Sequence, residues 1–276
     1  MLKLLERNIA SLERRLVLLA PPRAAIPETF VNVTTNPSRH VKLVREMQKI
    51  RGAIYLHQGS LKDHQLSSEG LHQTPEDEDS WHLLWTDSSG QVSSCAWYLE
   101  HGDATSIHQL RVRNCPLAHA AEWREKLTKA VSQEISRARH AGIRYAEVGG
   151  WAVSQARRCT SEGLVLALAA YGLCRMLGGA LGITNANLHS SSILRRLGGS
   201  YLEIDGTPMP SYFDPKYNTR IELLRFDSRS PSTKYVKLIE TLKSKLADVP
   251  VIASYRSSML FADGFIARSA EPAFAN

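Results

Sequence analysis

The sequence predicts an α/β fold in which a mixed β-sheet is flanked by helices. The stretch 143–198 contributes most to this prediction, because apolar runs of strand length alternate in it with segments of helical periodicity. The expected elements are a strand, a polar turn, a long apolar helix, a second strand and a second helix, at residues 143–153, 154–161, from 162, 180–184 and 189–197. This alternation is typical of a sheet with helices packed on it.

A β-hairpin and an N-terminal helix are the next clearest elements. The runs 81–86 and 92–101 are apolar and aromatic, and the Asp87-Ser88-Ser89-Gly90 turn between them ends in glycine, which is a strong hairpin signal. Residues 2–19 place leucine or isoleucine at spacings of three and four, which predicts an amphipathic helix ended by Pro21 and Pro22. We expect this helix to dock on the body of the protein; the alternative is a second subunit, giving a homodimer through the helix.

The remaining elements follow from shorter patterns. Strands are expected at 30–33, 53–56, 200–204 and 219–226, and helices at 38–51 (with Ser38 as N-cap), 120–140 and 232–246. The polar residues 57–80, with an acidic run from Glu76 to Asp79, predict a loop. The chain therefore divides into an N-terminal helix and linker (1–29), one folded domain (30–250) and a flexible C-terminal tail (251–276).

Composition limits the class of protein. With 276 residues, 43% hydrophobic and 22% charged, the chain can bury a sizeable core. Its net charge of +7 is spread along the chain and favours acidic partners, such as nucleotide phosphates or an acidic carrier protein, and no nucleic-acid motif accompanies it. The four cysteines form no zinc-type cluster, which predicts reduced thiols, no metal and a cytoplasmic protein. We expect no membrane span, because the chain has no sufficiently long apolar run.

The polar turn before residue 162 has the chemistry of a phosphate site. It gathers hydroxyls, guanidinium groups and a glycine at a helix N-terminus: Arg157, Arg158, Thr160, Ser161 and Gly163. The first N–H groups of a helix lack intrahelical acceptors, and the helix dipole adds a partial positive charge, so this end suits a phosphate or pyrophosphate. The alternative is that both arginines are solvated and Thr160 only caps the helix.

The order of these elements resembles the GNAT acyltransferases, in the branch of the acyl-homoserine-lactone (autoinducer) synthases and the long-chain N-acyl amino acid synthases. The resemblance covers roughly residues 40–226 and depends on the order and spacing of short motifs. Residues 49–55 (KIRGAIY) resemble the early L-R-x-x-V-F segment, and 79–85 with 90–97 resemble the acidic pair and central hairpin. Residues 147–153 (EVGGWAV) resemble the E-x-S-R-x-A-V strand. A GNAT-like mixed sheet flanked by helices, with an N-terminal helical extension, is implied.

The sequence also departs from this pattern. Gly149 and Gly150 stand where the autoinducer synthases have Ser-Arg, and Trp97 or Tyr98 replaces an arginine on the second hairpin strand. Two arginines of the amino-substrate site are therefore absent, which argues against lactone synthesis from S-adenosylmethionine. The turn 157–163 lacks the first glycine of Q/R-x-x-G-x-G/A, a departure that carrier-protein-dependent members tolerate better.

The resemblance implies a donor site. In this fold the strand before the turn parts from its neighbour, and the backbone of Trp151, Ala152 and Val153 would bind the pantetheine arm of an acyl thioester like an added strand. The turn 157–163 would hold the pyrophosphate or the carrier phosphate. Asn187 lies at the end of the next strand, where this fold presents side chains to the thiol leaving group.

The acceptor side needs a base, because N-acylation requires a neutral amine. Glu147 is the candidate for taking up the ammonium proton, directly or through water. The alternative is a salt-bridged structural glutamate. The acceptor itself would contact Arg51 and Asp79, which belong to the resembling motifs, and Tyr212, which is chosen by its position before the last strand.

These residues predict an N-acyltransferase. It would move an acyl group from an acyl-CoA or acyl-carrier-protein thioester to the amine of a small metabolite or amino acid, with no metal. Three alternatives remain open: an autoinducer synthase proper, a catalytically inactive ligand-binding or interaction protein, and an acetyltransferase acting on a protein.

Overall fold

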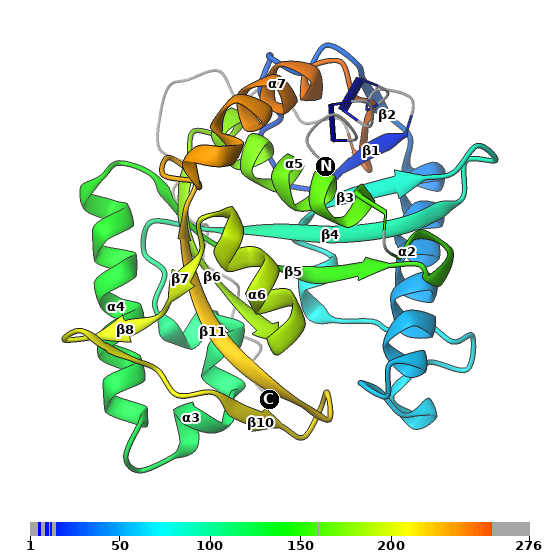
Figure 1. Ribbon diagram of the computed structural model, residues 1–276. Helices are drawn as coiled ribbons and strands as arrows, with labels where there is room; N and C mark the ends of the chain where they lie inside the picture. The colour runs from blue at the N-terminus through cyan, green and yellow to red at the C-terminus, as the bar shows by residue number, and fades with distance from the viewer. Residues whose placement is uncertain (1–4, 7–8, 11, 13–14, 159, 256–276) are drawn as a thin grey trace, which may run out of the picture.

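The computed structural model describes residues 5–6, 9–10, 12, 15–158 and 160–255, and a ten-stranded mixed sheet runs through this part of the chain (Figure 1). The strand order is β10-β11-β6-β5-β4-β3-β1-β12-β2, and β7 also pairs with β11. The strands are β1 (Leu16–Ala20), β2 (Val33–Thr35), β3 (Trp81–Thr86), β4 (Val92–His101), β5 (Arg144–Val153), β6 (Ala180–Asn187), β7 (Ser200–Tyr201), β10 (Tyr212–Asp214), β11 (Thr219–Asp227) and β12 (Val251–Ala253). A separate ribbon is formed by β8 (Glu203–Ile204) and β9 (Thr207–Pro208).

Helices cover both faces of the sheet. They are α2 (Pro37–His57), α3 (Pro116–His119), α4 (Arg124–His140), α5 (Glu162–Met176), α6 (Leu188–Leu197) and α7 (Val236–Leu246). Helices α5 and α7 pack together on one face, and α2 and α4 lie on the other (Figure 1). Neighbouring strand residues alternate between these layers: Ala146 lies in the α5 layer and Tyr145 in the α4 layer. Because α5 is enclosed by the sheet and α7, nearly all of its residues are apolar and buried.

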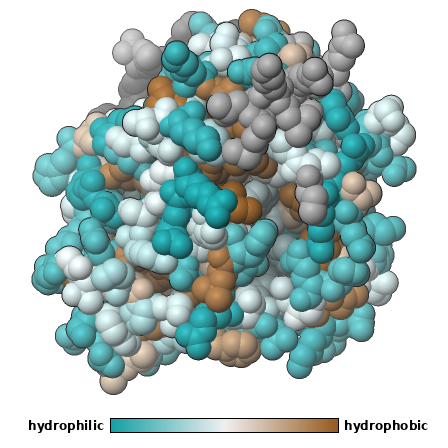
Figure 2. Space-filling model, in the orientation of Figure 1, coloured by the Kyte–Doolittle hydropathy of each residue, from teal (hydrophilic) through white to brown (hydrophobic). Residues whose placement is uncertain are grey.

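The exposed side chains are mixed in character, as the hydrophobic and charged content of the chain predicts. On the side shown in Figure 2, apolar side chains are exposed in several separate places among hydrophilic ones. Within the described residues, no helix combines the length and hydropathy needed to cross a membrane.

The N-terminal segment docks on the body of this chain. Leu5, Ile9 and Leu12 are buried in the apolar cluster of α5 and α7, so these side chains are not available to a second subunit. The expected helix nevertheless ends early, because Leu16–Ala20 is strand β1 between β3 and β12. All five strand residues are buried, and a short apolar run of this kind has the same pattern in a buried strand as in a buried helix. The rest of the expected helix lies mainly outside the described residues.

The C-terminal boundary at residue 250 is wrong. Val251–Ala253 is the buried strand β12, which pairs in parallel with both β1 and β2. Residues from both proposed extensions (1–29 and 251–276) therefore belong to the same sheet as the domain proposed at 30–250. Residues 256–276 lie outside the described part of the chain.

The first long helix also differs from the prediction. Helix α2 continues to His57, so the strand expected at 53–56 is helical. Its N-cap is Asn36, whose side chain accepts the N–H of Arg39, with Pro37 at the first helical position. Two further strands are corrected: the one expected at 30–33 lies at β2, and the one at 200–204 is divided between β7 and β8.

The hairpin and the central region are confirmed. Strands β3 and β4 have the predicted bounds, and α5 begins at Glu162 as expected. The mixed sheet flanked by helices is the predicted fold class.

Candidate active site

Strands β5 and β6 pair only at their first residues. Their parallel register runs from Arg144 opposite Ala180 to Glu147 opposite Ile183, and no later pair joins them in the described chain. Beyond Glu147, β5 stays with β4 while β6 stays with β11, and the two strands diverge (Figure 1). Most residues of both strands become half-buried there. The expected parting of the strands is confirmed, and each strand keeps one edge without a neighbouring strand, to which an extended ligand can add.

A β-bulge shapes β5 where it parts from β6. Trp97 pairs with Gly149 and Cys95 with Ala152, so one residue of β4 faces two of β5. Gly150 has φ +61°, and a Cβ there would lie 2.3 Å from the Trp97 indole; one at Gly149 would lie 2.4 Å from it. The two departures from the autoinducer synthases are therefore coupled, because the indole of Trp97 requires glycine at both positions.

We expect Gly150→Ala to lower the free energy of unfolding by about 2–4 kcal/mol, from backbone strain together with the collision with Trp97. Gly142→Ala is the matched control. Gly142 has φ +64° but open space around its Cβ position, so strain alone should cost about 1 kcal/mol there. Urea denaturation measures both, and equal losses would contradict the steric role of Trp97.

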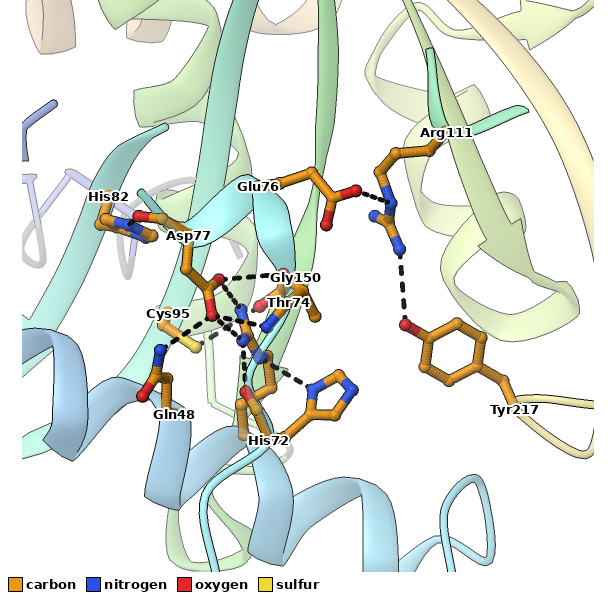
Figure 3. Close-up of polar contacts among 11 residues, drawn as sticks. Gln48, His72, Thr74, Glu76, Asp77, His82, Cys95, Arg111, Gly150 and Tyr217 are labelled. Atoms are coloured by element: carbon orange, nitrogen blue, oxygen red, sulfur yellow. Dashed lines mark hydrogen bonds and ion pairs between the residues drawn. The ribbon is translucent and has the colours of Figure 1, made fainter. Parts of the chain in front are cut away.

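A buried ion pair anchors the loop before β3 to helix α2 (Figure 3). The Arg51 and Asp77 side chains are 1% and 2% exposed, and their closest N–O distance is 2.7 Å. The remaining donors of Arg51 go to the Nδ1 and carbonyl oxygen of His72, and Gln48 donates to Asp77. Four of the five N–H groups of Arg51 are thus hydrogen-bonded inside the protein. The prediction that it contacts substrate is wrong, because the folded loop satisfies and covers its guanidinium group.

The acidic run before β3 supplies two carboxylates with different positions, and contact of Asp79 with the acceptor stays a prediction. Asp77 is the partner of Arg51, whereas Asp79 is exposed at the rim of a cavity described below. The sequence places both carboxylates in one run, and only the turn at Pro75–Asp77 decides which of them points inward.

Two histidines beside this ion pair are held neutral. Burial lowers the pKa of His72 to about 3, and the Arg51 guanidinium adds to the effect. Burial also lowers the pKa of His82 to about 4, although its Nε2 lies 2.8 Å from the carbonyl oxygen of Asp77. The unfolded chain, with ordinary histidines, therefore binds protons at a higher pH than the folded chain does.

Stability should consequently fall on acidification below about pH 6.5. Each of these histidines contributes a loss of up to about 1.4 kcal/mol per pH unit, His82 down to its folded pKa of about 4 and His72 down to about 3. Urea denaturation at pH 7 and pH 5 measures this change. The His72→Gln and His82→Gln variants should each show a flatter dependence, and an unchanged slope in both would contradict the assignment.

Glu147 lies at the point where the strands part. One carboxylate oxygen accepts the backbone N–H of Arg111 at 3.0 Å, and the other lies 3.0 Å from Nε2 of His101. The side chain is 4% exposed. The structure thus combines both readings of this residue: Glu147 is hydrogen-bonded into the fold, and it also lines a cavity.

That cavity has a volume of about 640 Å³ and lies between the loop before β3, the end of β4 and the segment that follows β4. Its lining combines acids with bases: Glu76, Asp79, Glu100 and Glu147, together with Arg23, Arg111, Arg113 and His101. Such a lining suits a small polar molecule bearing both charges. No cluster of three or more potential metal ligands occurs among the described residues.

Arg111 forms one wall of the site (Figure 3). Its guanidinium lies over the Trp97 ring at 5.1 Å, pairs with Glu76 at 3.2 Å and donates to the Tyr217 hydroxyl at 3.4 Å. Tyr217 in turn forms edge contacts with Tyr55 and His72. These aromatic rings connect helix α2 to the loop between β10 and β11.

Two further residues predicted for the site, Tyr212 and Asn187, have hydrogen-bond partners within the fold. Tyr212 is buried in β10, where its hydroxyl accepts a hydrogen bond from Asn185 at 3.2 Å, and its contact with the acceptor stays a prediction. Tyr217, in the following turn, is the residue of this segment that contacts Arg111. Asn187 caps α6 by accepting the N–H of Ser190, which leaves its amide N–H₂ group for other contacts.

The turn before α5 contains the expected residues in a different arrangement. Thr160 accepts the N–H of Glu162, as a cap would, and Arg157 lies 3.8 Å from the Glu162 carboxylate. That carboxylate is buried and accepts hydrogen bonds from Ser93 and Ser94. Arg158 is exposed, while Ser161 is buried next to the helix start. Glu162 therefore already places a negative charge at the N-terminus of α5.

The start of α5 lies close to β5. A Cβ at Gly163 would be 3.0 Å from Val153 and 3.4 Å from Trp151, so the missing side chain permits this approach. The turn and the free edge of β5 are thereby adjacent, as a single extended ligand would require.

Comparison with known proteins supports the fold. No protein-family model matches the chain, and neither does any curated protein. Two solved structures of a CoA-dependent acyl-homoserine lactone synthase, BjaI, one with SAM and isopentyl-CoA and one with MTA, superpose on the chain. Each is 14% identical and covers 88% of this chain and 94% of its own, with TM-scores of 0.51 and 0.52. The chain therefore has the fold of these synthases, as the resemblance predicted.

Arg111 and His101 line the cavity but were not predicted from the sequence as site residues. Both lie at the edges of regular elements: Arg111 in the 3₁₀ turn Arg111–Asn114, and His101 at the last position of β4. No periodicity marks such positions. The one available signal was a pair of basic residues, Arg111 and Arg113, in a stretch of mixed polar and apolar residues without clear periodicity.

Proposed function

We propose that this protein is an N-acyltransferase that uses an acyl-CoA or acyl-carrier-protein thioester to acylate the amine of a small metabolite or amino acid. The observation that supports this most directly is the parting of β5 from β6 immediately after Glu147. It leaves a free strand edge for a pantetheine arm next to a buried carboxylate that faces a polar cavity.

In the proposed reaction the neutral amine attacks the thioester carbonyl. A C–N bond forms, and the C–S bond breaks when the tetrahedral intermediate collapses. Glu147 takes up the proton that the ammonium group loses before attack. The nitrogen of the tetrahedral intermediate gives up a second proton, which reaches the departing thiolate directly or through water, so that the products are the amide and the free thiol. Asn187 remains the candidate for contacting the sulfur, through the amide N–H₂ group that its capping role leaves free.

The donor would bind along β5, with Trp151, Ala152 and Val153 contributing backbone groups. Arg157, Arg158, Thr160, Ser161 and Gly163 surround the position proposed for the phosphate. A second cavity of about 710 Å³ adjoins Arg157 and is lined by Arg15, Arg39 and Lys42. These basic residues favour a polyanionic donor, and both the nucleotide of CoA and an acidic carrier protein meet this requirement.

Native mass spectrometry with acyl-CoA donors of several chain lengths, and with acyl-carrier protein, tests the donor site. We expect Arg157→Ala combined with Arg158→Ala to weaken donor binding about ten-fold or more, because charge-assisted contacts to phosphate are lost. The matched control is Arg137→Ala with Arg139→Ala, which removes two arginines from α4. If no thioester binds wild-type protein at any chain length, the proposed function fails.

A catalytically inactive relative is the second candidate. The buried Glu162 carboxylate at the start of α5 favours it, because this charge opposes a phosphate at the same helix end. An autoinducer synthase proper is disfavoured, because the Trp97 indole packs on Gly149 and Gly150 where that family has arginine and serine.

A further inference from the structure

The guanidinium group of Arg111 is positioned for a ligand. Its plane lies over Trp97, Nε pairs with Glu76, and Nη2 donates to Tyr217. The side chain is 25% exposed and lines the 640 Å³ cavity. Nη1 has no hydrogen-bond partner among the described residues, so at least its two N–H groups remain for a molecule in the cavity.

Arg111 is also fixed relative to the proposed base. Its backbone N–H donates to the Glu147 carboxylate at 3.0 Å, so one residue joins the guanidinium wall of the cavity to Glu147. Arg111, Glu147 and His101 all line the same cavity, so a molecule that fills it can contact all three residues.

The local charge limits the anion. Glu76 already neutralises part of the Arg111 charge, and Asp79 and Glu100 lie on the same cavity wall. A monoanion with a planar pair of oxygens matches the remaining donors, whereas a phosphate dianion would meet these carboxylates. The same acids favour an ammonium group close to that anion.

We infer that Arg111 binds the carboxylate of the acyl acceptor and that the acceptor is an α-amino acid or another amine bearing a nearby carboxylate. This inference rests on the proposed function. Arg111 supplies, from the segment after β4, a guanidinium that lies over the Trp97 ring.

Acceptor binding without any donor tests the inference independently of catalysis. Calorimetry would compare the twenty free amino acids with the corresponding amino acid amides, in which the carboxylate is neutral. We expect at least one acid to bind wild-type protein at least ten-fold more tightly than its amide. Arg111→Gln should remove this preference, and Arg111→Lys should keep only part of it, because lysine retains the charge without the planar pair of donors.

Arg139→Gln is the matched control, since Arg139 lies outside the cavity and donates to the carbonyl oxygen of Asp103. It should leave the preference intact. If no free acid binds wild-type protein, or if amides bind equally well, the inference is overturned whether or not thioesters bind. If acids bind by way of Arg111 but no thioester does, the proposed function fails and the carboxylate site stands.

Discussion

Asp77→Asn should lower the free energy of unfolding by about 3–5 kcal/mol, because it leaves the Arg51 charge buried without its counter-ion. Asp77 also accepts hydrogen bonds from Gln48 and from Thr74, so the loss reaches the whole loop before β3. Urea denaturation at pH 7 measures the change.

The control is Asp79→Asn, two residues further along. Its carboxylate is exposed, and we expect a change within about 0.5 kcal/mol. Replacing both partners, with Arg51→Met and Asp77→Leu, should cost less than Asp77→Asn alone, because no unpaired charge remains. Equal effects at Asp77 and Asp79 would contradict the role assigned to the buried pair.

Glu147→Gln should lower kcat by about 10²–10⁴-fold, because the amide cannot accept the ammonium proton. Glutamine has the same shape and still accepts the Arg111 N–H, so donor binding and the free energy of unfolding should change little. Release of free thiol from an acyl-CoA or acyl-carrier-protein donor measures the turnover.

The variant Glu100→Gln tests whether Glu100, rather than Glu147, is the carboxylate that takes up the proton. Burial raises the pKa of Glu100, and its carboxylate accepts the Tyr98 hydroxyl at 2.8 Å on the neighbouring part of β4. We expect this variant to retain most of the turnover. If Glu100→Gln loses activity while Glu147→Gln keeps it, then Glu100 and not Glu147 takes up the proton, and the assignment to Glu147 is contradicted.

The sequence predicts the elements that local pattern determines. The β3–β4 hairpin has a turn of defined composition, and α5 begins where a polar turn meets a long apolar run, so both were placed correctly. Strands β1 and β12 could not be recognised, because their few apolar residues carry no period and acquire their structure by pairing with each other and with the neighbouring strands β3 and β2.

Some residues of the site were likewise predicted from the sequence, whereas the positions of others depend on contacts between distant segments. The strand that carries Glu147 was predicted from the sequence pattern, whereas its free edge was implied by the resemblance, and the structure brings the two together. Arg51 was misplaced because burial is decided by contacts between distant segments, such as the contacts of Arg51 with His72 and Asp77. Arg111 reaches Trp97 only because the segment after β4 folds back over the sheet, which no local spacing reveals.

Hydrogen–deuterium exchange with a non-reactive thioether analogue of acyl-CoA tests the central claim most directly, since it locates the donor. The account predicts slower exchange of backbone amides in residues 148–153 and at the start of α5 when the analogue is added. Protection confined to other segments, or the absence of binding by the CoA analogue and by acyl-carrier protein alike, would contradict it.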